Sequence, residues 1–268
     1  MNHASYHNHT HFSDGADAPE AFVAFAKAAN ITSLGFSDHY YKASPEATAT
    51  PDWALPCDTL DHYFDSIHDL KIRTEGIEIL AGLEFDWLEH SADWLKPIAR
   101  DPRLDYTIGS VHFVGNDAID LSPVYWQRLT EDEINHVIRA YWTAVRDMAA
   151  SGLFDIAGHL DLVKKFNFYS TEPMDNIISE ALDAITDTDM VIELNTAGWR
   201  KTCKVCYPAE ALLQECFRRE RPVLISSDAH QASLVAADFD RARDLLQRIG
   251  YKKLTRFHRR ERFFVPII

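Results

Sequence analysis

The chain has 268 residues and is acidic, with 27 Lys and Arg against 41 Asp and Glu and a formal net charge of −14. Its 46% apolar and 25% charged content is that of an ordinary globular protein, which excludes collagen-like, coiled-coil and disordered chains. The acidic balance argues against binding to nucleic acid or to anionic membrane surfaces, because both recognise clustered positive charge.

The sequence shows no sign of export or of membrane insertion. No apolar run approaches the roughly 18 residues of a membrane span, and no basic stretch followed by an apolar one opens the chain. Four cysteines in a chain of this length do not form a disulfide framework. We therefore expect a cytoplasmic protein with reduced thiols, either a monomer or a homodimer.

Short apolar runs alternate with amphipathic stretches along the whole chain. The runs that predict strands are Ser5–His9, Ile31–Ser37, Ile77–Phe85, Leu104–Val111, Phe154–Gly158, Met190–Asn195 and Val223–Ser227. Helical spacing or start signals predict helices over Asp17–Ala29, Asp58–Arg73, Glu131–Ala150, Pro208–Glu220 and Ala236–Ile249. Ser44–Pro56 has three prolines and no periodicity, so it is expected to be a loop. The alternation predicts one α/β domain over residues 1–268, with a mainly parallel sheet.

Residues that can bind metals follow almost every predicted strand. In chain order they are His7 and His9, Asp38 and His39, Glu84, His112, His159, Asn195, and Asp228 with His230. In a closed barrel these side chains would meet at one mouth, at the carboxyl ends of the strands. In an open sheet the outermost strands would lie too far apart to share a site. The positions therefore predict a barrel with its site at that mouth.

Imidazole and carboxylate groups together favour zinc, manganese or iron over calcium. Each motif has a structural alternative, since a single histidine pair is often a surface or core feature. Their convergence favours a metal site, and the number of ligands exceeds what one ion can take. We therefore expect two to three divalent metal ions (Zn, Mn or Fe).

Several motifs resemble those of the polymerase and histidinol phosphatase (PHP) family, in the same order. They are HNHTHFSDG at His7–Gly15, SDH at Ser37–His39, GLEFD at Gly82–Asp86, GSVHF at Gly109–Phe113, GHLDL at Gly158–Leu162 and SDAH at Ser227–His230. ELNTAGWRK at Glu193–Lys201 is similar to a segment of the monofunctional histidinol-phosphatase branch. The resemblance covers essentially the whole chain and implies a distorted (β/α)7 barrel with three metals.

Carried over to this chain, the resemblance implies three groups of metal ligands. The first is His7, His9, Glu84 and Asp228; the second is Asp14, His39 and His230; the third is His112 and His159, with Glu84 as a bridge. Among these, Asp228, His230 and Glu84 are the expected catalytic residues. The chain departs from the branch pattern at Thr202–Cys206 (TCKVC), which bears on the substrate. The two cysteines there, Cys203 and Cys206, are expected to be incidental loop thiols.

Closely spaced divalent ions can activate water and neutralise phosphoryl oxygens, as phosphate-ester hydrolysis requires. The predicted substrate-binding residues are Arg200, Lys164, Lys165 and Asn195, which end or follow the fifth and sixth strands. Lys201 follows the sixth strand too and is a further cation expected near the phosphate. Arg200 is the first choice because a guanidinium binds phosphate oxygens in pairs. Asp86, Glu89 and Asp161 are the carboxylates expected to bind a substrate amine.

These residues predict a metal-dependent phosphomonoesterase for a small-molecule phosphate ester. The branch resemblance implies hydrolysis of L-histidinol phosphate to L-histidinol and phosphate, a step of histidine biosynthesis. Three alternatives remain at this point: a phosphatase of another small substrate, such as a sugar or nucleotide phosphate; an amidohydrolase-like enzyme; and a metal-binding module without activity.

Overall fold

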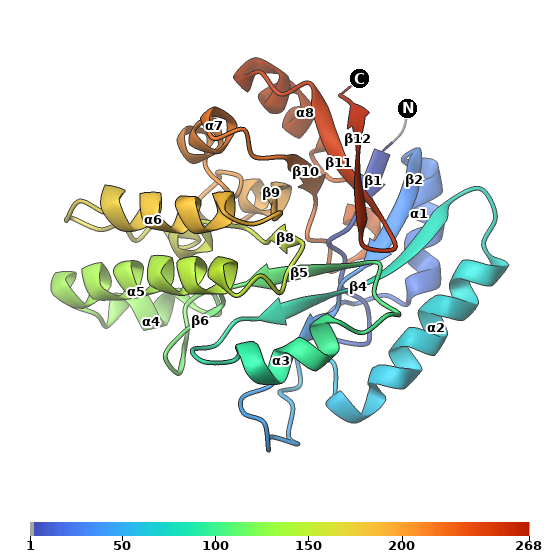
Figure 1. Ribbon diagram of the computed structural model, residues 1–268, viewed down its shortest axis with the longest axis horizontal. Helices are drawn as coiled ribbons and strands as arrows, with labels where there is room; N and C mark the ends of the chain where they lie inside the picture. Colours follow the sequence, from blue (N-terminus) through green and yellow to red (C-terminus); the bar gives the residue numbers. More distant parts are fainter. Residues whose placement is uncertain (1–2, 268) are drawn as a thin grey trace.

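A ring of parallel strands surrounded by helices forms the centre of the molecule (Figure 1). The computed structural model describes residues 3–267. Neighbouring strands follow the order β1 (His3–Ser5), β2 (Ile31–Phe36), β4 (Glu78–Asp86), β5 (Tyr106–Ser110), β8 (Ile156–Ala157), β9 (Val191–Asn195) and β10 (Val223–Ser226). The short strand β3 (His39–Tyr40) pairs with the end of β4.

The two edges of this sheet are joined at the carboxyl ends of β1 and β10. A parallel bridge links Asn8 to Ala229. The backbone amide of His9 donates to the Ala229 carbonyl at 2.9 Å, and the amide of Ala229 donates to the His7 carbonyl at 3.2 Å. This junction turns the sheet into a nearly closed barrel of seven strands, which confirms the predicted distorted (β/α)7 fold.

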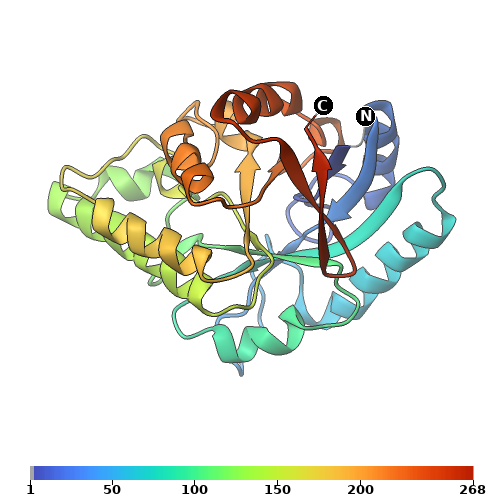
Figure 2. The same ribbon diagram turned by 45° about the horizontal axis from the view of Figure 1, so that its top comes forward.

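Each barrel strand is followed by a helix on the outside of the ring (Figures 1 and 2). In chain order these helices are α1 (Pro19–Ala28), α2 (Leu60–Arg73), α3 (Ala92–Ala99), α5 (Glu131–Ala150), α6 (Asp175–Thr186), α7 (Glu210–Arg218) and α8 (Phe239–Ile249). Helix α4 (Pro123–Gln127) and the hairpin of β6 (Phe113–Val114) and β7 (Asp117–Ala118) lie between β5 and α5. Single 3-10 turns lie at Cys57–Thr59, Leu162–Lys164, Thr196–Arg200 and Ala232–Leu234.

The predicted elements are present, with shifted ends. Helix α5 has the predicted bounds because its capping box forms: the Glu133 carboxylate accepts from the Thr130 amide at 2.7 Å, and the Thr130 hydroxyl accepts from the Glu133 amide at 3.4 Å. The first strand was predicted too long, since β1 ends at Ser5 and the segment after it bridges to Ala229 only once. The prediction for Ser44–Pro56 is confirmed, because this segment contains neither helix nor strand.

The sequence did not indicate the C-terminal hairpin of β11 (Lys253–His258) and β12 (Glu261–Pro266), the dark red strands in Figure 2. Its turn residues Arg259 and Arg260 have φ of 48° and 68°. Two-residue turns of this kind usually carry Asn-Gly or Gly-Gly, so the sequence lacks the ordinary hairpin signal. Helices α3 and α6 were also not predicted.

The hairpin closes the barrel at the amino ends of the strands. Phe257 packs inside the ring against Tyr6 and Tyr106, with ring centroids 6.0 and 6.4 Å away. Tyr106 fits because the nearby strands carry Gly35 and Gly82, where a Cβ would come within 2.4 Å of it. Ion pairs fix the hairpin further: His258 with Glu78 at 2.7 Å, Arg260 with Asp155 at 3.2 Å and Arg262 with Asp189 at 2.9 Å.

No helix within residues 3–267 is long and apolar enough to cross a membrane. The four cysteines, Cys57, Cys203, Cys206 and Cys216, are all free thiols.

We predict that Phe257→Ala lowers the free energy of unfolding by about 3–5 kcal/mol, because it leaves a cavity between Tyr6 and Tyr106. The matched control is Phe263→Ala in the same hairpin, whose side chain is 45% exposed. That change should stay within about 0.5 kcal/mol. Chemical denaturation of both variants provides the comparison, and equal effects would show that the hairpin does not close the core.

Candidate metal centre

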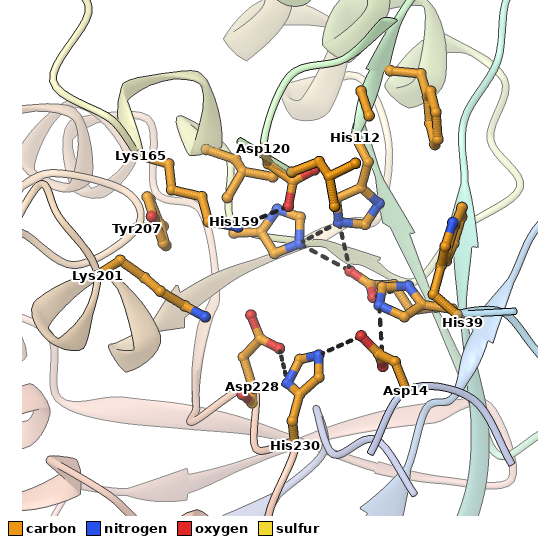
Figure 3. A pocket seen from close by; sticks show the side chains of 16 residues that line it. Asp14, His39, His112, Asp120, His159, Lys165, Lys201, Tyr207, Asp228 and His230 are labelled. Carbon is orange, nitrogen blue, oxygen red and sulfur yellow. Dashed lines mark hydrogen bonds and ion pairs between the residues drawn. The ribbon is translucent and has the colours of Figure 1, made fainter. Parts of the chain in front are cut away.

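A cavity of about 310 Å³ opens at the carboxyl ends of the strands, and titratable side chains cover its floor (Figure 3). The structure brings together all nine residues that the sequence predicted as metal ligands. They fall into overlapping groups whose ligand atoms lie within 4.8 Å of one another, and they are His7, His9, Asp14, His39, Glu84, His112, His159, Asp228 and His230.

The barrel junction places four of these residues. His7 and His9 flank Asn8 on the segment after β1, while Asp228 and His230 flank Ala229 on the segment after β10. His7 and His9 are alternate residues of their segment, so they point to the same side and lie buried beneath the cavity, which Asp228 and His230 line. Asp228 has a φ of 50°, a conformation that aspartate tolerates better than most residues.

Each of the three expected ligand groups is compact. In the first, His7 Nε2 lies 3.2 Å from Glu84 Oε2, and His9 Nε2 lies 3.4 Å from Asp228 Oδ1.

In the second group, two histidines approach Asp14 from different elements. His230 Nε2 lies 3.2 Å from Asp14 Oδ2, and His39 Nε2 lies 3.8 Å from Asp14 Oδ1. In the third group, His159 Nε2 lies 2.9 Å from Glu84 Oε1 and 3.2 Å from His112 Nε2. Glu84 therefore contacts members of the first and third groups with different oxygens, which fits a bridging role.

The donor atoms of this cluster fit divalent cations. Most of the buried side-chain nitrogen and oxygen atoms that have no hydrogen-bond partner among residues 3–267 belong to it, including His7 Nε2, both ring nitrogens of His9, His39 Nδ1 and Glu84 Oε2. Leaving such atoms buried and unpaired is costly, whereas a cation would satisfy several at once. The structure thus supports a centre for divalent metals.

The electrostatics of the cluster are those of a site that binds either protons or cations. Burial lowers the pKa of His39, but the Glu84 carboxylate overrides this and raises it to about 9. Burial also lowers the pKa of His112, but the Asp86 and Glu84 carboxylates override this and raise it to about 10. Protons on these rings balance the buried carboxylates when no cation is bound.

Other carboxylates hold the ligand side chains in place. Asp86 Oδ1 lies 2.6 Å from His112 Nδ1, and Glu193 Oε1 lies 2.6 Å from His7 Nδ1. Asp38 accepts from the amide of Thr10 at 2.7 Å and the hydroxyl of Ser13 at 2.6 Å, which fixes the loop that carries Asp14. The sequence analysis did not identify the role of Glu193. Its position could have indicated it, because Glu193 lies two residues before Asn195 and therefore on the same face of the strand.

The structure places Lys165 and Lys201 on the cavity wall, together with Asp120, Trp53 and Tyr207 (Figure 3). Lys165 was predicted to bind substrate, and its Nζ lies 2.9 Å from Asp120 Oδ2. Lys201 was expected on the same side of the barrel, as a cation near the phosphate, and it lies there. Its side chain extends toward Asp228, and within the described chain it has no carboxylate partner. These two lysines are the basic residues that line the cavity among residues 3–267.

The predicted position of Arg200 needs correction. Its guanidinium lies 2.8 Å from Asp238 Oδ2 and donates to the Ser227 carbonyl at 2.6 Å, so it is held behind the loop of Asp228. It is not among the described residues that line the cavity. Because residues 196–200 form a 3-10 turn, the chain directs Lys201, one position further on, to the cavity.

Lys164 and Asn195 also lie outside the cavity lining of the described chain. Lys164 is buried, pairs with Asp161, donates to the Cys206 carbonyl at 2.9 Å and lies over the Tyr207 ring. The side-chain amide of Asn195 is used inside the protein, where it donates to Asp228 Oδ2 at 3.2 Å. Both side chains are bonded to other groups of the protein, so they are not available to bind a substrate in the cavity.

The carboxylates expected to bind an amine are also placed differently. Asp86 is buried against His112, Asp161 is paired with Lys164, and Glu89 is exposed beside His90. Asp120 is the carboxylate on the cavity wall that is outside the ligand groups. Burial works to raise its pKa, but His112 and Lys165 hold the pKa of Asp120 below its ordinary value, so it is ionised at neutral pH.

Cys203 and Cys206 are buried thiols with protein contacts. Burial raises the pKa of Cys206 to about 12, which makes it a poor nucleophile at neutral pH. This agrees with the interpretation of the pair as loop thiols.

Comparison with known proteins connects this site to one family. The PHP domain family matches residues 5–197. The chain is 31% identical to a probable histidinol-phosphatase of Deinococcus radiodurans over 243 residues, 90% of this chain and 91% of that protein. It is 27% identical to the histidinol-phosphatase of Bacillus subtilis over 87% of this chain and 96% of that protein.

Solved structures show the same fold. Histidinol phosphate phosphatase from Lactococcus lactis, determined with zinc, L-histidinol and phosphate, superposes with a TM-score of 0.80 at 25% identity, covering 98% of this chain and 100% of that one. A histidinol phosphatase structure from Listeria monocytogenes gives a TM-score of 0.78 at 21% identity, covering 89% of this chain and 99% of that one.

We predict that zinc or manganese binding to the metal-free protein releases protons. His39 and His112, with pKa values of about 9 and 10, carry protons at pH 6–8 that a bound cation must displace. The pKa values of His7 and His230 are raised as well, so the overall binding constant should rise by at least about two orders of magnitude per pH unit in this range. Metal titrations in weakly buffered solution with a pH indicator measure the release; binding with no proton release would contradict the prediction.

Proposed function

Because the chain belongs to the PHP family, we propose that it is a metal-dependent phosphomonoesterase that hydrolyses L-histidinol phosphate to L-histidinol and phosphate, in histidine biosynthesis. The observation that carries this proposal is the convergence of nine ligand residues around one cavity. The Lactococcus lactis relative, whose structure contains zinc, L-histidinol and phosphate and covers 98% of this chain, supports the choice of substrate.

The proposed centre holds two to three divalent ions of zinc, manganese or iron. His7, His9, Glu84 and Asp228 would hold one, Asp14, His39 and His230 a second, and His112, His159 and Glu84 a third. When bound, such cations neutralise phosphoryl oxygens and lower the pKa of water, so that a nucleophile is available near neutral pH. The ligands come from residues 7–230, which supports treating residues 1–268 as a single PHP-type domain.

Three residues of the floor are proposed to act in catalysis. Asp228 is partly exposed to the cavity, with 15% side-chain exposure, and is placed to accept a proton from the attacking water. Asp228 would then pass that proton to the leaving oxygen. His230 Nδ1 lies 3.5 Å from Asp228 Oδ1 and is placed to orient this carboxylate. Glu84 is buried, and its two oxygens keep the neighbouring imidazoles in their relative positions.

Lys201 and Lys165 are proposed to bind the phosphate. Both line the cavity beside the ligand cluster, and Lys201 has no carboxylate partner in the described chain that would compete for it. Lys165 is paired with Asp120, so a phosphate would have to draw it away from that carboxylate.

Asp120 is proposed to bind the amine of the substrate. A substrate with one phosphate and one ammonium group can replace the Lys165–Asp120 pair by two new ion pairs, one with each residue. The apolar wall of Trp53, Phe113, Leu121 and Leu162 leaves room for the ring of such a molecule.

The first test is phosphate release from L-histidinol phosphate by purified protein loaded with manganese or zinc, compared with sugar and nucleotide monophosphates. L-Histidinol phosphate should have the highest kcat/KM, and Asp228→Ala should keep less than about a tenth of kcat, because a lost ligand costs more than about 1.4 kcal/mol of barrier. Glu89→Ala, at an exposed position, is the control. A higher kcat/KM for another monoester would make that monoester the assigned substrate. A fully active Asp228→Ala variant would show that Asp228 has no catalytic role.

Lys201→Ala is predicted to lower kcat/KM for L-histidinol phosphate about 10- to 100-fold, mainly through KM, because it removes one charge-assisted contact to phosphate. Lys204→Ala, an exposed lysine in the same loop, should leave the kinetics unchanged. Steady-state kinetics on both variants decide the point: identical behaviour would exclude Lys201 as a phosphate ligand.

Asp120→Asn is predicted to reduce the preference for substrates that carry an amine. The ratio of kcat/KM for L-histidinol phosphate to that for p-nitrophenyl phosphate should fall about tenfold or more, because one ion pair is lost with the first substrate only. A ratio equal to that of the unmodified protein would show that the amine binds elsewhere.

A further inference from the structure

We infer that Glu193 is a positioning residue, which holds His7 and the backbone of His159 so that the ligand atoms face one another. Glu193 begins the ELNTAGWRK segment, but it is not one of the nine candidate ligands, and its side chain does not line the cavity among the described residues. The inference rests on the proposed metal centre, and it assigns a function to strand β9, which offers no histidine to the site.

The hydrogen bonds of Glu193 connect three strands that carry ligands. Its Oε1 lies 2.6 Å from His7 Nδ1, after β1, and accepts from the Ser226 hydroxyl at 2.5 Å, in β10. Its Oε2 accepts from the backbone amide of His159 at 2.7 Å, after β8. The side chain is fully buried, so water does not compete for these bonds.

The contact with His7 fixes which ring nitrogen faces the site. A carboxylate accepts only, so the hydrogen of the His7 ring is placed on Nδ1. Nε2 is then the nitrogen that can offer a lone pair to a cation; it lies 3.2 Å from Glu84 Oε2 and 3.8 Å from Asp228 Oδ1, with no hydrogen-bond partner among residues 3–267. This is the arrangement in which a carboxylate behind a histidine orients the ring and makes it a stronger ligand.

Asn195 extends the same support to Asp228. Its Nδ2 donates to Glu193 Oε2 and to Asp228 Oδ2, at 3.2 Å in each case. Its Oδ1 accepts from the Ala197 amide at 2.9 Å, which fixes the direction of the side-chain amide. Glu193 and Asn195 share one face of β9 and hold residues from the strands on both sides of it.

The test compares Glu193→Gln with the unmodified protein in zinc titrations of the metal-free forms, using a competing chelator. The amide keeps the size of the side chain but loses the charge and the purely accepting character. Zinc affinity should fall about 10- to 100-fold, as found when the carboxylate behind a histidine ligand is lost. Glu193→Asp keeps the carboxylate, should recover part of the affinity, and serves as a second variant if the glutamine form does not fold.

Asp155→Asn is the matched control. Asp155 is a half-buried carboxylate, with 17% side-chain exposure, that also accepts from a backbone amide, that of Thr107 at 2.8 Å, but it precedes β8 at the opposite end of the barrel. Its loss should lower the melting temperature and leave zinc affinity unchanged. Equal losses of affinity in Glu193→Gln and Asp155→Asn would mean that Glu193 has only a structural role, and would overturn the inference.

A spectroscopic measurement gives an independent answer. In the zinc-loaded, ¹⁵N-labelled protein, the His7 Nδ1 proton should appear as a downfield resonance that exchanges slowly with water, and Glu193→Gln should shift or remove it. If this resonance and zinc affinity are both unchanged in Glu193→Gln, the inference fails while the metal centre stands. If the unmodified protein itself binds no zinc, the proposed function fails first.

Discussion

The junction between Asn8 and Ala229 is the contact on which the site depends. Its two backbone hydrogen bonds join the first and last strands of the sheet, and metal-ligand candidates lie on both sides of it: His7 and His9 on one segment, Asp228 and His230 on the other. Without this junction the two segments would belong to opposite edges of an open sheet. Barrel closure and assembly of the site are therefore the same event, while the C-terminal hairpin secures the other end of the ring.

This arrangement concentrates charged side chains in the interior of the protein. Glu84, Asp86 and Glu193 are buried among imidazole rings, and an ionised carboxylate inside a protein is costly unless positive charge lies beside it. Protons on His39 and His112 supply that charge in the metal-free protein, and cations would supply it in the loaded one. The buried carboxylates and the histidines of the cluster thus compensate one another.

The candidate metal ligands and the proposed substrate-binding residues lie on different kinds of structural element. The ligand cluster lies on strand ends and on segments tied to neighbouring strands, whereas Lys165, Lys201 and Asp120 come from the loops that follow the strands. A barrel of this kind keeps its chemistry on the rigid ring and its substrate contacts on the loops. The departure from the family pattern at Thr202–Cys206 lies between Lys201 and Tyr207, which line the cavity, while the segment itself is outside the lining of the described chain.

The sequence by itself determined the barrel, the approximate places of its strands and eight of the nine candidate ligand positions, because a polar residue after an apolar run is visible at a strand end. Asp14 does not follow a strand, and only the family resemblance indicated it. The sequence did not determine which way the loop side chains point. Arg200 and Lys201 are neighbours in sequence, yet a 3-10 turn directs one to Asp238 and the other to the cavity. The support from Glu193 and the hairpin that ends with Phe257 inside the barrel were also decided by tertiary structure, because their partners, His7 and Tyr6, lie 186 and 251 residues away along the chain.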